Sequence, residues 1–173
     1  MDSNQTFWVF GYGSLIWRPG FDFVSSQSAY LCGYHRSLCV YSHTYRGTPE
    51  KPGLVFGLVP GGCCEGRAFE VAPDKWPLVL AYLRERETDV YHELQNGVRL
   101  ADGKMVKALI FVADDRHSQY AGDLARQKQL DIIRHARGAI GTNKDYVLNT
   151  LEHLGELGIK DSYLSDLGKN LLK

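Results

Sequence analysis

An apolar segment that runs directly into a glycine-rich turn places the strongest constraint on how this chain folds. Phe7 to Phe10 is rich in aromatic and β-branched residues, which predicts a buried strand. Gly11-Tyr12-Gly13-Ser14 follows at once, and its glycines allow a tight turn that leaves main-chain N–H groups open to an anion. The segment is therefore a candidate site for a carboxylate or for the oxyanion of a transition state. A tight turn between two core strands is the alternative interpretation.

The spacing of the glycines, the net charge of the chain and its hydropathy argue against several other classes of protein. A dinucleotide-binding loop requires a third glycine where Ile16 stands, and the Gly-Lys-Ser/Thr of a P-loop does not occur. Lys plus Arg and Asp plus Glu number 20 each, without the basic excess typical of nucleic-acid binders. The polar start, residues 1–6, lacks the features of a signal peptide, and the apolar run 108–113 is too short to cross a membrane. We expect a cytoplasmic protein with no nucleic-acid or membrane partner.

The cysteines and histidines predict neither a metal site nor a cofactor. The six histidines are scattered without the spacing of metal ligands, and no Cys-x-x-Cys pair occurs. The four cysteines are Cys32, Cys39, Cys63 and Cys64. A disulfide between adjacent cysteines would be strained, so we expect free thiols in the core or on the surface, and not a redox site.

Short strands with glycine turns precede a mostly helical second half. The expected strands are 29–41, 54–60, 64–71, 98–100 and 106–113, with turns at Gly61-Gly62 and 101–104. The expected helices are 72–87, 121–137, 143–157 with Asn143 as its N-cap, and 161–172. This order predicts an α+β protein, in which an antiparallel sheet curls toward a barrel, and a single domain over residues 1–173.

The helix that begins at Ala72-Pro73-Asp74 ends in a carboxylate on its apolar side. Its apolar stripe comprises Trp76, Leu80 and Leu83, and the next step of four residues reaches Glu87. Burial and the negative end of the helix dipole would raise the pKa of Glu87, whereas Arg84 and Arg86 would lower it. A carboxylate with a pKa near neutrality can accept and return a proton. The alternative is a frayed last turn with Glu87 in solvent.

Five short motifs occur in order over most of the chain. They are Phe10-Gly11-Tyr12-Gly13-Ser14-Leu15, Gly33-Tyr34-His35-Arg36, Arg46-Gly47-Thr48-Pro49 with Pro52-Gly53, Arg86-Glu87, and Asn143-x-x-Tyr146. Together they resemble the ChaC-type, glutathione-specific γ-glutamylcyclotransferases. The resemblance implies a small mixed or antiparallel β-barrel flanked by helices. Thr88-Asp89-Val90-Tyr91 departs from the family, whose members often have glycines after the glutamate, and this leaves the breadth of γ-glutamyl substrates open.

The resemblance also implies which residues form the site. It places the γ-glutamyl group against Val9, Phe10, Gly11, Tyr12, Gly13, Ser14 and Leu15. It makes Glu87 the catalytic acid and base, and it puts Tyr120 at a site position. Arg46 is a candidate partner for the distal carboxylate of the substrate through a bidentate contact, or else a structural arginine that binds loop carbonyls. Ser14 is expected to form hydrogen bonds and not to act as a nucleophile.

The implied reaction is an internal aminolysis of a small molecule. The α-amine of the γ-glutamyl residue attacks its own side-chain carbonyl, which forms 5-oxoproline and releases Cys-Gly from glutathione. No serine, cysteine, metal or cofactor has to supply the nucleophile. We expect a monomer that acts on glutathione. The alternatives are a cyclotransferase for other γ-glutamyl amino acids or amines, and a non-catalytic γ-glutamyl-binding regulator of cation transport.

Overall fold

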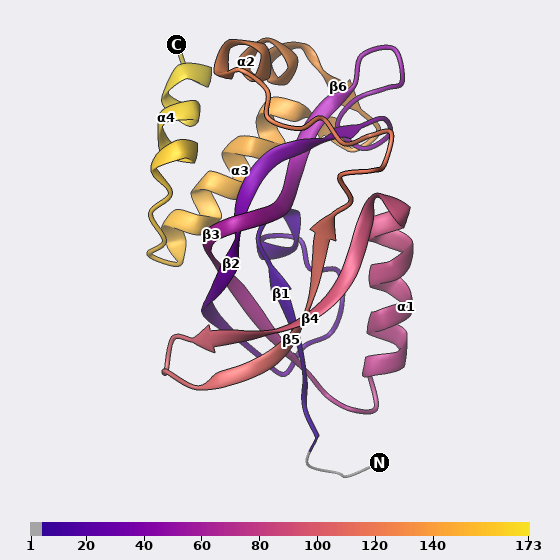
Figure 1. The fold of residues 1–173 in the computed structure, drawn as a ribbon, viewed down its shortest axis with the longest axis vertical. Helices are drawn as coiled ribbons and strands as arrows, with labels where there is room; N and C mark the ends of the chain where they lie inside the picture. The colour runs from indigo at the N-terminus through magenta and orange to yellow at the C-terminus, as the bar shows by residue number, and fades with distance from the viewer. Residues whose placement is uncertain (1–4) are drawn as a thin grey trace. The chain divides into compact units, whose positions relative to one another are not determined.

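A closed, five-stranded mixed barrel is the central element of the computed structural model, which describes residues 5–173 (Figure 1). Its strands are β1 (Phe7–Gly11), β2 (Ser25–Ser42), β3 (Gly53–Val71), β4 (Tyr91–Leu100) and β5 (Met105–Ala113). They follow one another around the barrel in the order β1-β3-β2-β4-β5. The strand β1 pairs antiparallel with β3 and parallel with β5, so the shortest strand closes the barrel. The α+β class and the barrel are therefore confirmed.

The helices lie between and after the barrel strands. They are α1 (Trp76–Glu87), α2 (Arg126–His135), α3 (Asn143–Glu156) and α4 (Ser162–Leu171). Short 3-10 helices, η1 (Ser14–Ile16) and η2 (Thr88–Val90), follow β1 and α1, and the two-residue strands β6 (Arg137–Gly138) and β7 (Gly141–Thr142) pair with each other. None of the helices within residues 5–173 combines the length and the apolar character needed to cross a membrane.

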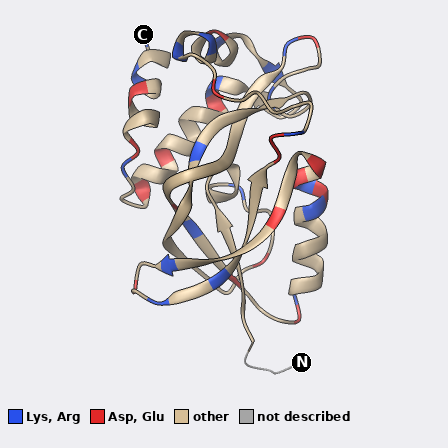
Figure 2. Ribbon diagram, viewed as in Figure 1, with Lys and Arg blue, Asp and Glu red and all other residues tan. Residues whose placement is uncertain are grey.

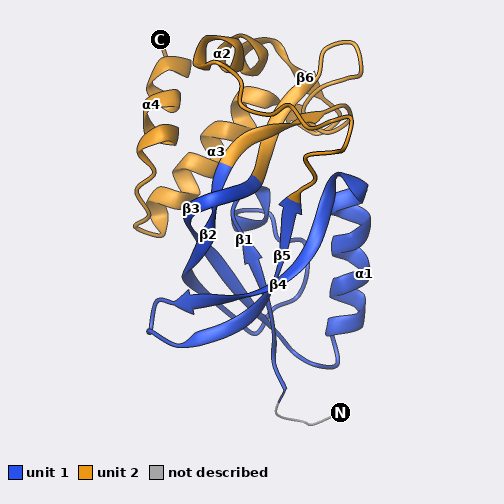
Figure 3. Ribbon diagram, in the orientation of Figure 1, with its two compact units in different colours: residues 1–36, 58–112 blue, residues 37–57, 113–173 orange. Residues whose placement is uncertain are grey.

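The chain divides into two compact units, each built from two separate segments (Figure 3). Unit 1 comprises residues 1–36 and 58–112, and unit 2 comprises residues 37–57 and 113–173. Unit 1 contains β1, α1 and β4, whereas unit 2 contains α2, α3 and α4. The long strands β2 and β3 contribute residues to both units. The single domain over residues 1–173 remains a prediction.

The core of unit 1 forms where α1 packs on the barrel. Val79 and Leu83 of α1 are buried in one cluster with Val9, Phe69 and Leu109, which come from β1, β3 and β5. Successive side chains of a strand point to opposite faces, so Phe10 faces away from the side on which Val9 meets α1. Val9 and Phe10 are both fully buried, and β1 is therefore covered on both faces.

The strand β3 is continuous where the sequence predicts a turn. Gly61 and Gly62 have φ angles of +103° and +68°, but the chain does not reverse between them. The neighbouring strand β2 is equally continuous over 18 residues. Because β2 continues alongside, the main-chain N–H and C=O groups of β3 keep hydrogen-bond partners in the sheet. The two glycines therefore distort the strand locally but do not end it.

Two helix starts and one N-cap differ from the sequence prediction. The helix α2 begins at Arg126 and not near residue 121. Residues 72–75 form a turn that precedes α1, in which Lys75 N–H donates to the carbonyl of Ala72 at 3.0 Å. Thr142, and not Asn143, is the N-cap of α3, because its side chain accepts from Asp145 N–H at 3.1 Å. Asn143 is fully buried instead and binds the main chain of Leu54.

The core of unit 2 forms largely as the helical pattern predicts. In α3 the expected inward residues Tyr146, Val147 and Leu154 are buried. Tyr146 stacks on Phe56 of β3 with ring centroids 5.4 Å apart, and its hydroxyl accepts from Phe56 N–H at 2.9 Å. The helices α2, α3 and α4 pack on one another (Figure 1). The last helix, α4, is amphipathic as expected and buries Leu164 on its inner face.

Candidate active site

The turn after β1 is held rigidly by contacts at both ends of Tyr12. The Tyr12 hydroxyl donates to the carbonyl of Phe111 at 2.5 Å, and the Tyr12 carbonyl accepts from Arg36 Nε at 2.6 Å. Arg36 is itself buried and also donates to the carbonyl of Glu65 in β3. Hydrogen bonds from a charged group are stronger than neutral ones, so Arg36 fixes the turn to the barrel.

Close packing explains the glycine at the end of β1. A Cβ at Gly11 would lie 2.9 Å from the Leu15 Cβ, because η1 folds back over the strand end. The first turn of η1 is closed by Ile16 N–H, which donates to the Gly13 carbonyl at 3.0 Å. The first N–H groups of a helix have no partner inside it. The N–H groups of Gly13 and Ser14 are therefore candidate donors to an anion.

The remaining residues of the predicted binding segment have structural contacts. Val9, Phe10 and Gly11 pair with β3 as part of the barrel, and Leu15 is buried in the cluster that contains Val9. Only the turn itself, Tyr12 to Ser14, lies outside the strand and before the buried part of η1. Substrate binding by the segment from Val9 to Leu15 remains a prediction. The turn is the part of this segment whose main-chain groups are not paired within β1.

Arg86 joins the end of α1 to this turn. Its Nη2 donates to the Ser14 hydroxyl at 2.9 Å, and its Nη1 donates to the carbonyls of Arg18 and Pro19 at 2.5 and 3.0 Å. Nη1 also contacts the Tyr82 hydroxyl one helical turn earlier, at 2.9 Å. The sequence pattern assigns Arg86 only a charge effect, because Ser14, Arg18 and Pro19 lie 72, 68 and 67 positions away in the chain. The structure shows that it positions the helix end beside the turn.

Glu87 is the last residue of α1 and directly follows this anchored arginine. Its side chain is partly buried, and burial raises its pKa to about 7 from its ordinary value of 4.5, whereas the Arg86 charge lowers it. Figure 2 shows residues of both signs at this end of α1. Within residues 5–173 the carboxylate has no hydrogen bond or ion pair, so it is available to a ligand.

The backbone bends sharply immediately after Glu87. Thr88 has φ +57° and ψ −165°, and it is the sole residue other than glycine with a positive φ in residues 5–173. Such values are unfavourable for a β-branched residue. The bend ends α1, and Val90 of η2 is then buried before β4 begins at Tyr91. Glu87 is therefore bounded by Arg86 on one side and by a strained residue on the other.

The two predicted site residues of unit 2 differ in burial. Arg46 is buried, its Nη1 donates to the Thr142 carbonyl at 3.1 Å, and its guanidinium lies 5.6 Å from the centre of the Tyr146 ring. These contacts are those expected of an arginine with a structural role, which binds main-chain carbonyls. Tyr120 is partly exposed and pairs with Val40 of β2, and burial is the main cause that raises its pKa. A substrate contact remains a prediction for both residues.

The cysteines and the potential metal ligands are possible sources of chemistry besides the turn and α1. All four cysteines are free thiols. In the part of the chain that the structure describes, no three His, Cys, Asp or Glu side chains lie close enough together to hold a metal ion. Arg86 contacts the turn through Ser14, and Glu87 directly follows Arg86.

Comparison with known proteins gives consistent matches over nearly the whole chain. A family model described as ChaC-like protein matches residues 7–173. A glutathione-specific γ-glutamylcyclotransferase of Escherichia coli K12 is 36% identical over 162 residues, which cover 92% of this chain and 70% of that protein. γ-Glutamylcyclotransferase 2-3 of Arabidopsis thaliana is 31% identical over 95% of this chain and 87% of its own length.

The fold is shared with a solved structure. The crystal structure of a yeast γ-glutamyl cyclotransferase specific to glutathione superposes with a TM-score of 0.90 at 21% identity. The match covers 98% of this chain and 96% of the yeast chain. The expected γ-glutamylcyclotransferase fold is therefore confirmed.

Proposed function

Because the chain belongs to the ChaC-like protein family, we propose that it cleaves glutathione into 5-oxoproline and Cys-Gly. The observation that carries this proposal is Glu87, a carboxylate with a pKa of about 7 whose helix end is anchored to the turn after β1. The Escherichia coli relative, which is named for this reaction, supports the choice of glutathione. Cytoplasmic localisation and a monomeric state remain predictions.

The proposed mechanism uses the substrate's own amine as the nucleophile. An α-amino group titrates near about 8 and is mostly protonated at neutral pH. Glu87 has a pKa of about 7, so removal of this proton by the carboxylate is nearly balanced in free energy. The amine then attacks the γ-carbonyl carbon, and the protonated Glu87 returns the proton to the nitrogen of the departing Cys-Gly. One carboxylate therefore serves as base and then as acid.

The turn after β1 is suited to stabilise the charge that develops on the carbonyl oxygen. The N–H groups of Gly13 and Ser14 are the proposed donors to this oxygen or to the α-carboxylate. Arg36 and Phe111 hold Tyr12 in place, so these donors do not have to reorganise during the reaction. Arg86 keeps Glu87 next to the turn, and its charge keeps a larger fraction of Glu87 ionised at neutral pH.

The test is to measure 5-oxoproline by mass spectrometry after incubation of the purified chain with glutathione. Glu87→Gln keeps the shape of the side chain but removes the proton acceptor, so we expect turnover to fall by roughly 100-fold or more. Glu85→Gln, on the exposed side of the same helix, is the matched control and should keep full activity. Circular dichroism of both variants checks that the fold is intact. Full turnover by a folded Glu87→Gln variant would contradict the proposed mechanism.

A second candidate is a broader cyclotransferase for γ-glutamyl amino acids or amines. Two observations favour testing it, namely the Arabidopsis relative, whose name specifies no glutathione, and Thr88, where resemblance leads us to expect a glycine. Rates for glutathione, γ-glutamyl amino acids and γ-glutamyl amines distinguish the two candidates. A protein that binds these compounds and forms no 5-oxoproline would instead be the non-catalytic regulator.

A further inference from the structure

Two exposed thiols from neighbouring barrel strands lie next to each other in unit 1. The Sγ atoms of Cys32 in β2 and Cys63 in β3 are 3.5 Å apart, and both residues are exposed. The other two cysteines, Cys39 and Cys64, are buried. Sequence spacing does not reveal this pair, because its members are 31 positions apart and come together only through pairing of the strands.

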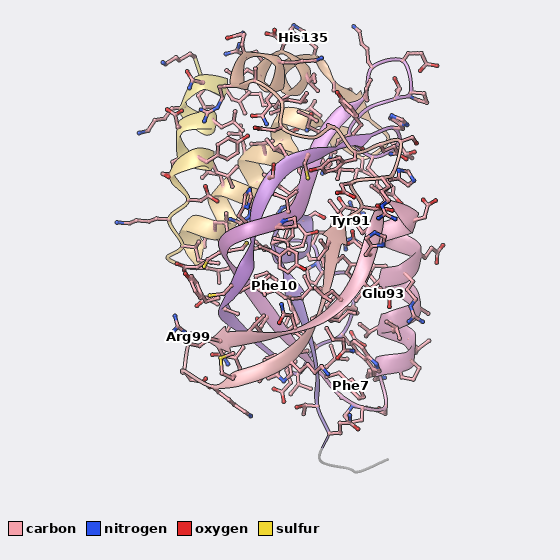
Figure 4. The ribbon with its side chains drawn as sticks, viewed as in Figure 1. Phe7, Phe10, Tyr91, Glu93, Arg99 and His135 are labelled. Carbon is pink, nitrogen blue, oxygen red and sulfur yellow. The ribbon has the colours of Figure 1, made fainter. Side chains whose placement is uncertain are left out.

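The surroundings of the pair favour a thiolate on Cys63. Hydrogen bonds from the Tyr30 hydroxyl and from Cys32 lower the pKa of Cys63, with a further contribution from Gly33 N–H. The same hydrogen bond raises the pKa of Tyr30 to about 12, which keeps the hydroxyl a donor. Arg99 of β4 lies over the Tyr30 ring at 5.1 Å, and Figure 4 shows Arg99 near the end of its strand. The hydrogen bond with Cys63 raises the pKa of Cys32, the partner thiol, and the Arg99 charge lowers it. An exposed cysteine whose thiolate accepts hydrogen bonds is typical of reactive thiols.

The backbone beside both cysteines has the freedom that a shorter sulfur–sulfur distance requires. Gly33 follows Cys32 with φ +95°, and apart from its two chain neighbours no residue lies within 4 Å of the position that a Cβ would take there. Gly61 and Gly62, also with positive φ, precede Cys63. A disulfide needs its sulfur atoms about 2.05 Å apart. Glycines on both strands allow the small local adjustment without distortion of the buried part of the barrel.

We propose that Cys32 and Cys63 form a reversible disulfide, with a low-molecular-weight disulfide as the oxidant. The Cys63 thiolate attacks one sulfur of the oxidant, which forms a mixed disulfide and releases one small thiolate. The Cys32 thiol then loses its proton to solvent and attacks the Cys63 sulfur, which releases the second small thiolate. The two cysteines are oxidised by two electrons, and the small disulfide is reduced to two thiols.

The proposed disulfide would connect the same two strands that anchor the active-site turn. Arg36 of β2 and the carbonyl of Glu65 in β3, which are in contact with each other, lie four and two residues from the two cysteines. Arg36 also holds the Tyr12 carbonyl. The disulfide itself does not depend on the proposed cyclotransferase reaction, and its test uses a probe without a γ-glutamyl group.

The test equilibrates the reduced full-length chain near neutral pH with 2-mercaptoethanol and its disulfide in graded ratios. The mixtures are quenched with acid, alkylated under denaturing conditions and analysed by peptide mass spectrometry. We expect Cys32 and Cys63 to escape alkylation together as the buffer becomes more oxidising, with a loss of two hydrogen atoms from the intact mass. Excess thiol should restore both cysteines, and Cys39 and Cys64 should stay alkylated throughout.

Variants separate the proposed pair from the other thiols. Cys32→Ser should trap a stable mixed disulfide on Cys63, because the resolving thiol is absent. Cys64→Ala, beside Cys63 in sequence but buried, is the control that should keep the cross-link. Tyr30→Phe should slow the reaction of Cys63 severalfold by removing a hydrogen bond to its thiolate. The proposal is overturned if Cys32 and Cys63 are oxidised independently, if Cys64 forms the cross-link, or if the wild-type pair stays reduced in the most oxidising buffer.

Discussion

At the scale of single residues, Glu87 illustrates how burial and charge oppose each other. Burial raises its pKa to about 7, and the neighbouring Arg86 charge limits this rise. Arg86 is held in place by the Ser14 hydroxyl and by the carbonyls of Arg18 and Pro19. The same arginine therefore positions the helix end and tunes its carboxylate.

The raised pKa of Glu87 predicts a pH-dependent stability. A carboxyl whose pKa is about 7 in the folded state and 4.5 in the unfolded state holds its proton more tightly when folded. Stability is therefore unaffected below about pH 4.5, falls as the pH rises toward 7, and stays lowered above 7. The full effect is at most about 3 kcal/mol. Glu87→Gln lacks this ionisation, so its stability relative to wild type should increase between pH 5 and 8.

Urea unfolding of both proteins at several pH values measures this difference. Glu85→Gln, which removes an exposed carboxylate from the same helix, is the control and should track the wild type. If the gap in unfolding free energy between Glu87→Gln and wild type is constant from pH 5 to 8, the pKa of Glu87 is not raised in the folded state.

At the scale of secondary-structure elements, one strained residue connects α1 to η2. Thr88 adopts a positive φ directly after Glu87, in a region of backbone conformation that only glycine enters at low cost. The chain can hold this strained conformation because it is fixed on both sides of the bend. Leu83 and Arg86 fix α1 before it, and the buried Val90 fixes η2 after it.

Substitution of Thr88 tests this account. Inside a helix or strand, a protein with alanine is usually more stable than one with glycine at the same position, by about 0.5–1 kcal/mol. At Thr88 we expect the reverse order, with Thr88→Gly more stable than Thr88→Ala by about 1 kcal/mol, because only glycine relieves the positive φ. Thermal unfolding of the two variants measures the difference, and both lose the same side-chain contacts. Greater stability of the alanine variant would show that this bend is not strained.

At the scale of the whole molecule, each unit depends on segments that are far apart in the chain. In unit 2, the buried Asn143 at the start of α3 binds both main-chain groups of Leu54 in β3. Its Oδ1 accepts from Leu54 N–H at 2.8 Å, and its Nδ2 donates to the Leu54 carbonyl at 2.7 Å. One side chain therefore joins residues that are 89 positions apart.

Loss of this amide should destabilise the protein strongly. Asn143→Ala leaves a buried N–H and a buried carbonyl without partners, and each unsatisfied group costs about 1–3 kcal/mol. We therefore expect a loss of roughly 2–6 kcal/mol in the free energy of unfolding. Thr142→Ala, which removes the adjacent N-cap, is the control and should cost about 1 kcal/mol. Similar losses for the two variants in urea unfolding would contradict the proposed role of Asn143.

Local patterns predict most elements of the fold but not all of their boundaries. The strand over Phe7–Phe10, the end of α1 at Glu87 and the inward face of α3 follow from hydrophobic periodicity. Gly61-Gly62 resembles a turn, but the long neighbouring strand β2 keeps β3 continuous. Asn143 resembles an N-cap, but its amide has a buried main-chain partner and Thr142 caps the helix instead.

The amino-acid sequence by itself determined the family, the α+β class and the candidate carboxylate, because these depend on short motifs and on local periodicity. The tertiary structure decided how far Glu87 is buried, which loop Arg86 holds and which cysteines are neighbours. The physical reason is that burial and contact between distant residues arise from the packing of elements. The spacing of residues within one segment does not reveal that Cys32 and Cys63 are neighbours. Nor does it reveal that Arg86 binds Ser14, which is 72 positions away in the chain.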